Sequence, residues 1–317
     1  MERGINRMLL IALSICLLLI LWGARFCYRL VFYNVNETVN DVFTDPPGKQ
    51  YDAVSDILKE NIRKLQEIPF EQIYLKASDG ETLAGKYYHF RDNAPVQILF
   101  HGYRGNGTRE FACGNQMAKE IGYNTIVVDE RAHGKSGGHT ISFGIKERWD
   151  CRDWANYATK RFGKETKLIL SGVSMGAATV LMASELDLPD TVAAITADCP
   201  YSAPGTIIRK VTSDVKLPPW LIYPFVVLGA FVFGHFCLWS SSPVKAVRNT
   251  KIPILLIHGE DDRFVPCNMS REIRDACKGP AVLVTFPEAG HGLSYLTDTA
   301  RYHRIYREFF RICKITA

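Results

Sequence analysis

The 317-residue sequence lacks the patterns that mark several common classes of protein. It contains no run of lysines and arginines of the kind that binds nucleic acid, and its net charge is only +5. No internal repeat or low-complexity tract occurs, and the 24 glycines follow no triplet period, which excludes a collagen-like chain. With 47% apolar and 22% charged residues, the chain is too hydrophobic to be disordered. We therefore expect a globular protein that does not bind nucleic acid.

The common signatures of bound metals and dinucleotides are missing as well. The nine cysteines are scattered, with no CxxC pair and no Cys/His ligand spacing. No HExxH motif occurs, and no GxGxxG motif follows the first predicted strand of the sheet. We therefore expect no metal and no cofactor. The odd number of cysteines leaves at least one thiol unpaired within the chain, for which a reducing environment is the simpler interpretation.

One long apolar run is present, from Met8 to Ala24. Its length lies at the lower end of the roughly 17–25 residues that a membrane-spanning helix needs. The residues at 22–24, Trp-Gly-Ala, are a poor signal-peptidase site, which favours an uncleaved anchor over a cleaved signal peptide. The run has no polar face, which disfavours a buried helix. Arginines flank both ends, so the side of the membrane that holds the rest of the chain stays open.

The distribution of apolar and polar residues predicts three segments: a single-pass membrane anchor (1–29), a linker with a short helix (30–69) and a globular body (70–317). The body opens with a hairpin around Asp79-Gly80, and short apolar runs then alternate with helical stretches. The apolar runs are 96–100, 125–128, 168–170, 192–196, 254–257 and 282–286. This alternation predicts an α/β fold with a mostly parallel, doubly wound sheet and helices on both faces. We expect the last helix at 294–313.

More than fifty residues separate the strands predicted at 192–196 and 254–257, where a plain crossover needs far fewer. Within this insertion, about 202–248, the stretch 217–239 is strongly apolar. Its prolines and glycines disfavour a second straight span, which would also divide one sheet across a membrane. We expect a helical cap over the C-terminal edge of the sheet. The cap would bury itself, line an apolar pocket or rest on a bilayer surface.

A candidate nucleophile lies in the sequence Gly-Val-Ser-Met-Gly at 172–176, between a predicted strand and a predicted helix. This setting is typical of a nucleophile elbow, in which small flanking residues leave room for a strained turn that exposes Ser174. An oxyanion hole needs two backbone N–H donors. We expect one from Met175, directly after the serine, and the other from Tyr103, in the glycine-rich loop 101–107 after the first parallel strand.

The serine needs a base, and the base needs an acid that orients it. His291 follows the strand at 282–286, and Asp262 follows the strand at 254–257. The order Ser174, Asp262, His291 is the order of α/β hydrolases. Two other acids stay open as alternatives, Asp261 and Asp198. Three further histidines are expected to support loops by hydrogen bonding: His101, His133 and His258.

Five motifs occur in order: FHGYRGN (100–106), VDERAHGKS (128–136), GVSMGAAT (172–179), HGEDDRFVP (258–266) and AGH (289–291). On these the chain resembles an α/β hydrolase of the serine aminopeptidase or prolyl oligopeptidase catalytic-domain type over about residues 70–313. More narrowly, it resembles bacterial single-spanning hydrolases with a membrane anchor. The resemblance implies Ser174 as nucleophile, Asp262 as acid and His291 as base. The chain departs from the family pattern at Ala132, where glycine is usual.

Together these features predict a membrane-anchored serine hydrolase that cleaves a carboxylic ester or related acyl bond through an acyl-enzyme. A serine peptidase and an acyltransferase are alternatives that use the same triad, and a non-catalytic binding protein is a third. The expected partners are a small-molecule or lipid-like acyl substrate and the membrane, through the N-terminal helix. The acyl group, the leaving group and the oligomeric state stay open.

Overall fold

The computed structural model describes residues 2–35, 42–46 and 48–315 and is built around one eight-stranded sheet. The strand order is β1-β2-β4-β3-β5-β6-β7-β8. β1 and β2 form the predicted antiparallel hairpin, β2 is antiparallel to β4, and every other pair is parallel. The strands are β1 (Glu71–Lys76), β2 (Thr82–Tyr88), β3 (Val96–Phe100), β4 (Asn124–Asp129), β5 (Leu168–Val173), β6 (Val192–Asp198), β7 (Ile254–Gly259) and β8 (Ala281–Phe286). The predicted mostly parallel sheet is confirmed.

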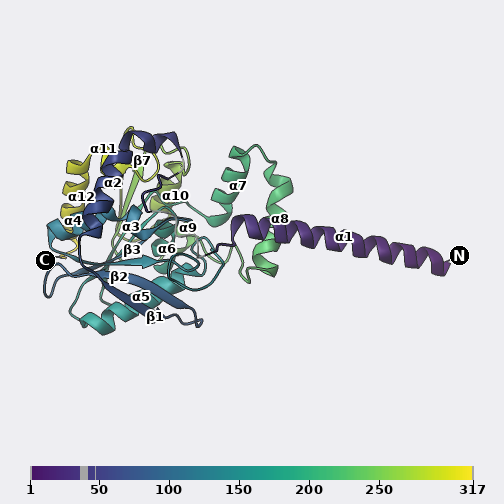
Figure 1. The fold of residues 1–317 in the computed structure, drawn as a ribbon, viewed down its shortest axis with the longest axis horizontal. Helices are drawn as coiled ribbons and strands as arrows, with labels where there is room; N and C mark the ends of the chain where they lie inside the picture. The colour runs from purple at the N-terminus through teal and green to yellow at the C-terminus, as the bar shows by residue number, and fades with distance from the viewer. Residues whose placement is uncertain (1, 36–41, 47, 316–317) are drawn as a thin grey trace.

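Helices cover both faces of this sheet (Figure 1). Alternate residues of one strand point to opposite faces. In β7, Ile254 and Leu256 pack with α5 (Glu147–Phe162), α6 (Met175–Ala183) and α10 (Asn268–Ala276), whereas Leu255 and Ile257 pack with α4 (Ala112–Ile121) and α12 (Thr299–Ile312). The remaining helices are η1 (Lys49–Val54), α2 (Ser55–Gln66), α3 (Gly107–Glu110), α7 (Pro204–Asp214), α8 (Pro219–Val232), α9 (Pro243–Ala246) and α11 (Ser294–Thr297). Burial on both faces explains the continuous apolar runs of the strands.

The N-terminal helix α1 (Glu2–Val31) projects from the body (Figure 1). In the described part of the chain it is the one helix long and apolar enough to cross a membrane, over Asn6–Val31. It extends to Val31, past the predicted anchor boundary at residue 29. Its last turn packs on the body, where Tyr28 and, just after the helix, Phe32 are buried. Parts of the predicted linker, residues 36–41 and 47, lie outside the described residues.

The predicted cap corresponds to α7, α8 and α9, which follow β6. The last helix differs from the prediction, because the single helix expected at 294–313 is divided into α11 and α12. Asp298 interrupts it with a non-helical backbone (φ −148°, ψ 81°), and its side chain accepts a hydrogen bond from the Arg301 amide at 2.9 Å. An aspartate in this position begins a new helix by capping its N-terminus.

Candidate active site

Ser174 lies in the sharp turn between β5 and α6, with φ 54° and ψ −112°. Such a conformation costs a non-glycine residue about 1–3 kcal/mol and persists only where the surroundings enforce it. The two flanking glycines are required because there is no room for a side chain at either position. A Cβ at Gly172 would overlap the backbone of Gly176, and a Cβ at Gly176 would overlap the carbonyl group of Phe100. The elbow therefore fits closely against the end of β3.

A chain of two hydrogen bonds starts from this serine. The Ser174 hydroxyl lies 2.9 Å from Nε2 of His291, and Nδ1 of His291 lies 2.6 Å from Oδ2 of Asp262. The three side chains come from the carboxyl ends of β5, β8 and β7, which meet at one edge of the sheet. Burial alone would raise the pKa of Asp262, but hydrogen bonds from His258, His291 and a backbone amide hold it well below its usual range. The carboxylate is therefore ionised and orients the imidazole.

The two alternative acids do not take part in this chain. Asp261 is exposed to solvent. Asp198 is buried at the end of β6, and its Oδ2 accepts a hydrogen bond from the Tyr302 hydroxyl at 3.2 Å. Burial raises the pKa of Asp198 to about 6. Asp262 is the acid that the structure brings to His291.

The expected oxyanion donors lie beside the serine. A Cβ at Gly102, in the loop after β3, would lie 3.4 Å from Cβ of Ser174, so this loop borders the serine. Within the described residues, neither the Tyr103 amide nor the Met175 amide has a protein acceptor. Both N–H groups are therefore free to bind an oxyanion.

Buried histidines hold the loops around the serine. Nε2 of His101 accepts a hydrogen bond from the Glu130 amide, and Nε2 of His133 accepts one from the Arg104 amide, both at 3.0 Å. Each ring donates from Nδ1 to a nearby backbone carbonyl. Burial lowers the pKa of His101 to about 4 and that of His133 to about 3, so both rings are neutral near pH 7.

His258 supports the acid. Its Nδ1 accepts a hydrogen bond from the Ser270 hydroxyl at 2.6 Å, and its Nε2 donates to the Val265 carbonyl at 2.8 Å. The same Nε2 lies 3.3 Å from Oδ2 of Asp262. The three additional histidines thus occupy the supporting positions expected from the sequence.

Comparisons with known proteins agree with this fold. Residues 95–231 match a family model described as the alpha/beta hydrolase fold, and residues 237–315 match one described as TAP-like protein. The chain belongs to the α/β-hydrolase superfamily. It is 22% identical to the uncharacterized protein YqkD of Bacillus subtilis over 90% of this chain and 91% of that protein.

Solved structures of α/β hydrolases share the fold. An esterase from Pyrococcus furiosus superposes with a TM-score of 0.63 and 23% identity, over 78% of this chain and 92% of the esterase. An acylaminoacyl peptidase from Pyrococcus horikoshii superposes with a TM-score of 0.57 and 19% identity, over 81% of this chain and 44% of the peptidase. Both bond classes expected from the sequence, ester and amide, are thus represented among proteins similar in fold.

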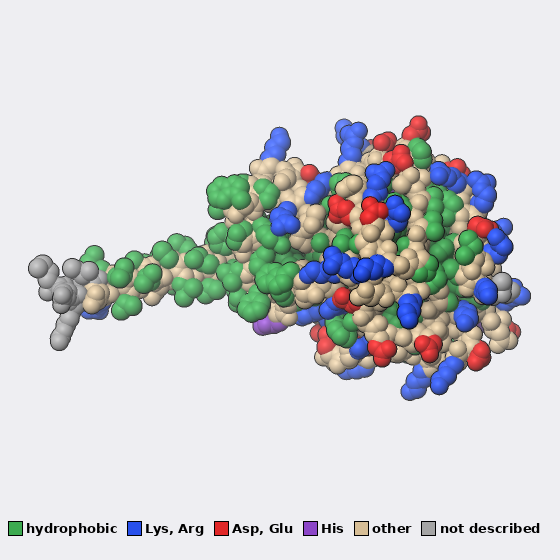
Figure 2. Space-filling model, turned by 180° about the vertical axis from the view of Figure 1, so that it is seen from behind, with side chains coloured by type: hydrophobic (Ala, Val, Ile, Leu, Met, Phe, Trp, Pro, Cys, Tyr) green, Lys and Arg blue, Asp and Glu red, His purple; other side chains and the backbone are tan. Residues whose placement is uncertain are grey.

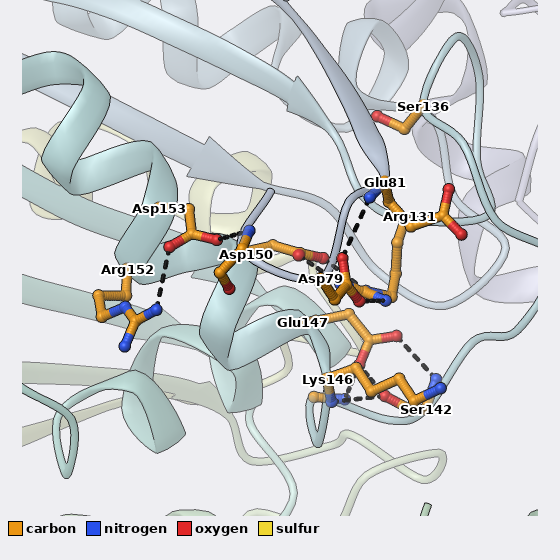
Figure 3. A network of polar contacts seen from close by, with 12 residues as sticks. Asp79, Glu81, Arg131, Ser136, Ser142, Lys146, Glu147, Asp150, Arg152 and Asp153 are labelled. Atoms are coloured by element: carbon orange, nitrogen blue, oxygen red, sulfur yellow. Dashed lines mark hydrogen bonds and ion pairs between the residues drawn. The ribbon is translucent and has the colours of Figure 1, made fainter. Parts of the chain in front are cut away.

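A buried ion-pair network anchors the loop after β4 in this α/β hydrolase (Figure 3). Arg131 binds both carboxylate oxygens of Asp150, at 2.6 and 2.5 Å, and Asp79 at 2.9 Å. The next residue, Ala132, has φ 62°, a left-handed conformation that favours glycine. The glycine usual in the family is thus explained by the backbone, and here alanine adopts the same turn.

Glu110 has a role that sequence reasoning missed. Its carboxylate is held against the loop after β3, where Oε2 accepts a hydrogen bond from the Gly102 amide at 2.6 Å. A side chain at Gly105 would overlap this carboxylate, which explains a further glycine of the loop. Burial raises the pKa of Glu110. No motif pointed to Glu110, since the residue is eight positions from its partner.

The segment before α2 contacts the histidine loop. The Tyr51 hydroxyl donates to the His291 carbonyl at 2.9 Å, and Oε1 of Gln50 accepts from the His291 amide at 3.2 Å. Burial raises the pKa of Tyr51, and the nearby Cys199, Glu110 and Asp262 raise it further. The predicted linker thus supports the position of His291, a role that its sequence did not indicate.

The end of α1 contacts the loop after β3, which carries Tyr103, the expected oxyanion donor. The Tyr103 hydroxyl donates to the carbonyl of Val31 at 2.7 Å. The Arg104 guanidinium donates to the carbonyls of Leu30 at 2.9 Å and Tyr33 at 3.1 Å. Carbonyls at a helix C-terminus lack helical partners and carry partial negative charge, so a cation there is stabilising. The proposed anchor helix is therefore bonded directly to the candidate site.

One group of described side chains has the donor types of a metal site. A carboxylate oxygen of Asp262, a ring nitrogen of His291 and the sulfur of Cys199 lie within 4.8 Å of one another. The first two already share a proton at 2.6 Å, and the Cys199 thiol has a pKa raised well above its usual value by burial. A metal bound here would have to displace both protons.

Proposed function

We propose that this protein is a membrane-anchored serine hydrolase that cleaves a carboxylic ester or a related acyl bond. The observation that carries the proposal is the hydrogen-bonded chain from Asp262 through His291 to Ser174. A serine on a strained elbow, hydrogen-bonded to a histidine that an ionised carboxylate orients, is an activated nucleophile.

The chemistry follows from these positions. Nε2 of His291 takes the proton of Ser174 as Oγ attacks the substrate carbonyl, and the amides of Tyr103 and Met175 stabilise the oxyanion. The imidazolium, stabilised by Asp262, then gives the proton to the leaving group, whose bond to the acyl carbon breaks. His291 next takes a proton from water, which attacks the acyl-enzyme, and returns that proton to Ser174 as the acid product leaves.

An apolar environment favours lipophilic acyl groups as substrates. Met175 and Tyr103 belong to a hydrophobic cluster that continues through Phe143 into the cap helices and the end of α1. Tyr103 stacks on Phe143, with ring centroids 5.0 Å apart. The membrane anchoring rests on α1, whose apolar side chains from Met8 to Ile20 are mostly exposed.

Labelling with a fluorophosphonate probe tests the activated serine. We expect wild-type protein to be labelled, Ser174→Ala to be unlabelled, and Asp262→Asn and His291→Ala to be labelled slowly. An ester series of increasing acyl length, with matched amides and an added alcohol acceptor, separates an esterase from a peptidase and an acyltransferase. A folded wild type that stays unlabelled and turns over no substrate would contradict the proposal and favour a binding protein.

A further inference from the structure

The cap helix α8 has an apolar surface on every side. Its sequence, PWLIYPFVVLGAFV, contains no charged residue. One face packs into the protein through Val226, Gly229 and Ala230. A second face carries Trp220 and Phe231, which are 78% and 63% exposed. A helix that is apolar all round is normally enclosed by protein or by lipid, so the exposed face lacks a partner.

The exposed residues form a continuous stripe. Trp220, Pro224 and Phe231 are exposed and are spaced i, i+4 and i+11, which places them on one side of the helix, with the half-buried Val227 at i+7 between them. Trp220 and Phe231, the large side chains at the two ends of this stripe, are the most exposed. The stripe spans nearly the whole length of α8, about 17 Å at 1.5 Å per residue.

The helix crosses α1 at a defined height. The ring of Phe225 lies against Gly23, and Gly229 lies against Ala24 and Tyr28. In Figure 1, α8 runs across α1 rather than along it, and in Figure 2 apolar side chains gather around the base of α1. A helix that crosses a membrane-spanning helix in this way lies along the membrane plane.

The point where α8 crosses α1 lies about one hydrocarbon thickness from Met8, where the apolar run of α1 begins. From Met8 to Phe26 the rise of α1 is about 27 Å, close to the roughly 30 Å of a hydrocarbon core. Trp22 and Phe26, 71% and 57% exposed, stack on each other there with ring centroids 6.0 Å apart. Aromatic side chains concentrate at the boundary between hydrocarbon and water.

The charged residues near the crossing of α1 and α8 also favour contact with a membrane at this surface. The sequence contains no Asp or Glu between Arg3 and Asn36 or between Val215 and Gly259, the two segments that meet at the crossing. Exposed cations lie there instead: Arg25, Arg29 and Lys216. Arg25 lies over the ring of Phe233, 5.2 Å from its centroid. Asp214, exposed directly before the second segment, is paired with Lys210. A predominantly basic border next to an apolar stripe fits anionic phospholipid headgroups.

We propose that the stripe of α8 inserts into the headgroup–acyl boundary of the phospholipid bilayer that α1 spans. The cap then rests on the membrane, and an acyl substrate reaches Ser174 from the bilayer. This inference rests on the membrane anchoring of the proposed function. It adds that the cap itself contacts lipid.

Tryptophan emission measures the contact in the full-length protein. The protein is reconstituted in vesicles of phosphatidylcholine and phosphatidylglycerol, with or without bromine on the acyl chains, and iodide serves as the aqueous quencher. The emission lost in Trp220→Phe, relative to wild type, reports the cap. The emission lost in Trp22→Phe reports α1. Trp149 lies on α5, outside α1 and the cap helices, and is 38% exposed, so Trp149→Phe is the matched control for a water-facing indole.

We expect brominated lipid to quench the Trp22 and Trp220 components by about half and iodide to quench the Trp149 component. If Trp22 is quenched by lipid but Trp220 by iodide, the anchor stands and the cap proposal is wrong. If Trp220 is shielded from both quenchers, another protein surface covers the stripe, and the proposal is again wrong. If lipid quenches neither indole, the anchoring fails and the cap proposal fails with it.

Discussion

Replacing Asp262 with asparagine changes one atom and reverses a hydrogen bond. Oδ1 of Asp262 accepts the amides of Phe264 and Val265, at 2.9 and 2.8 Å, while Oδ2 accepts from His291. Two backbone donors hold the amide oxygen of an asparagine in the Oδ1 position. Its NH₂ group then faces Nδ1 of His291 and donates to it. The imidazole must carry its proton on Nε2, where it cannot accept the proton of Ser174.

The expected cost is a fall in kcat of about 10⁴-fold, or about 5.5 kcal/mol of transition-state stabilisation, as in other triads that lose the correct tautomer. Hydrolysis of a p-nitrophenyl ester measures kcat, and circular dichroism verifies folding. Asp198→Asn is the matched control, since Asp198 is a buried acid near the site that bonds to Tyr302, and its kcat should stay close to wild type. A kcat of Asp262→Asn above about a tenth of the wild-type value, or an equal loss of activity in Asp198→Asn, would contradict the role assigned to Asp262.

Three further predictions concern the loops around the serine. Gly176→Ala should lower the free energy of unfolding by about 3 kcal/mol because its Cβ would meet backbone, whereas Gly114→Ala, on a helix where the Cβ would meet only the Phe111 ring at 3.4 Å, should be neutral or stabilising; urea unfolding compares them. Arg104→Gln should cost about 1 kcal/mol and lower kcat several-fold with KM unchanged, because α1 then restrains the loop after β3 only through the bond from the Tyr103 hydroxyl to the Val31 carbonyl; a raised KM with normal kcat would contradict this. The pKa of His101 is lowered from 6.5 to about 4, so between these values the unfolded chain binds a proton that the folded chain does not. Stability should therefore fall as the pH is lowered through this window, by up to about 1.4 kcal/mol per pH unit, and His101→Asn should flatten that slope in urea titrations; an unchanged slope would contradict it.

Local chemistry made the sheet and the elbow predictable. Strands such as β3 are buried on both faces, so they appear in the sequence as short unbroken apolar runs. The glycines around Ser174 were predictable because the turn leaves no room for a Cβ. The positions of Asp262 and His291 followed from strand order, since the carboxyl ends of parallel neighbours meet at one edge.

Long-range contacts were not predictable. Gln50 lies 241 residues from His291, and no local pattern marks a tyrosine or glutamine that will cover a distant loop. The role of Glu110 was not predictable for a different reason. In the sequence, a carboxylate at the end of a short helix resembles an ordinary solvent-exposed charge, and only the folded structure shows that it is buried. The break at Asp298 was also missed, because an aspartate inside an amphipathic pattern does not by itself reveal that it caps a new helix.

The last turn of α1 connects the proposed membrane anchor directly to the candidate active site. A membrane anchor that served only as a tether would end in solvent, yet the last turn of α1 ends on the loop that supplies the Tyr103 amide. Arg104 closes the same junction, and its own amide is bonded to His133, which is neutral and buried. A tilt or shift of α1 would therefore act on the loop after β3 through the hydrogen bonds to Leu30 and Val31, and through a third to Tyr33 just after the helix, rather than through a flexible linker. In the proposed anchoring, bilayer thickness would then alter kcat with little effect on KM, because the loop contacts the transition state more strongly than the substrate.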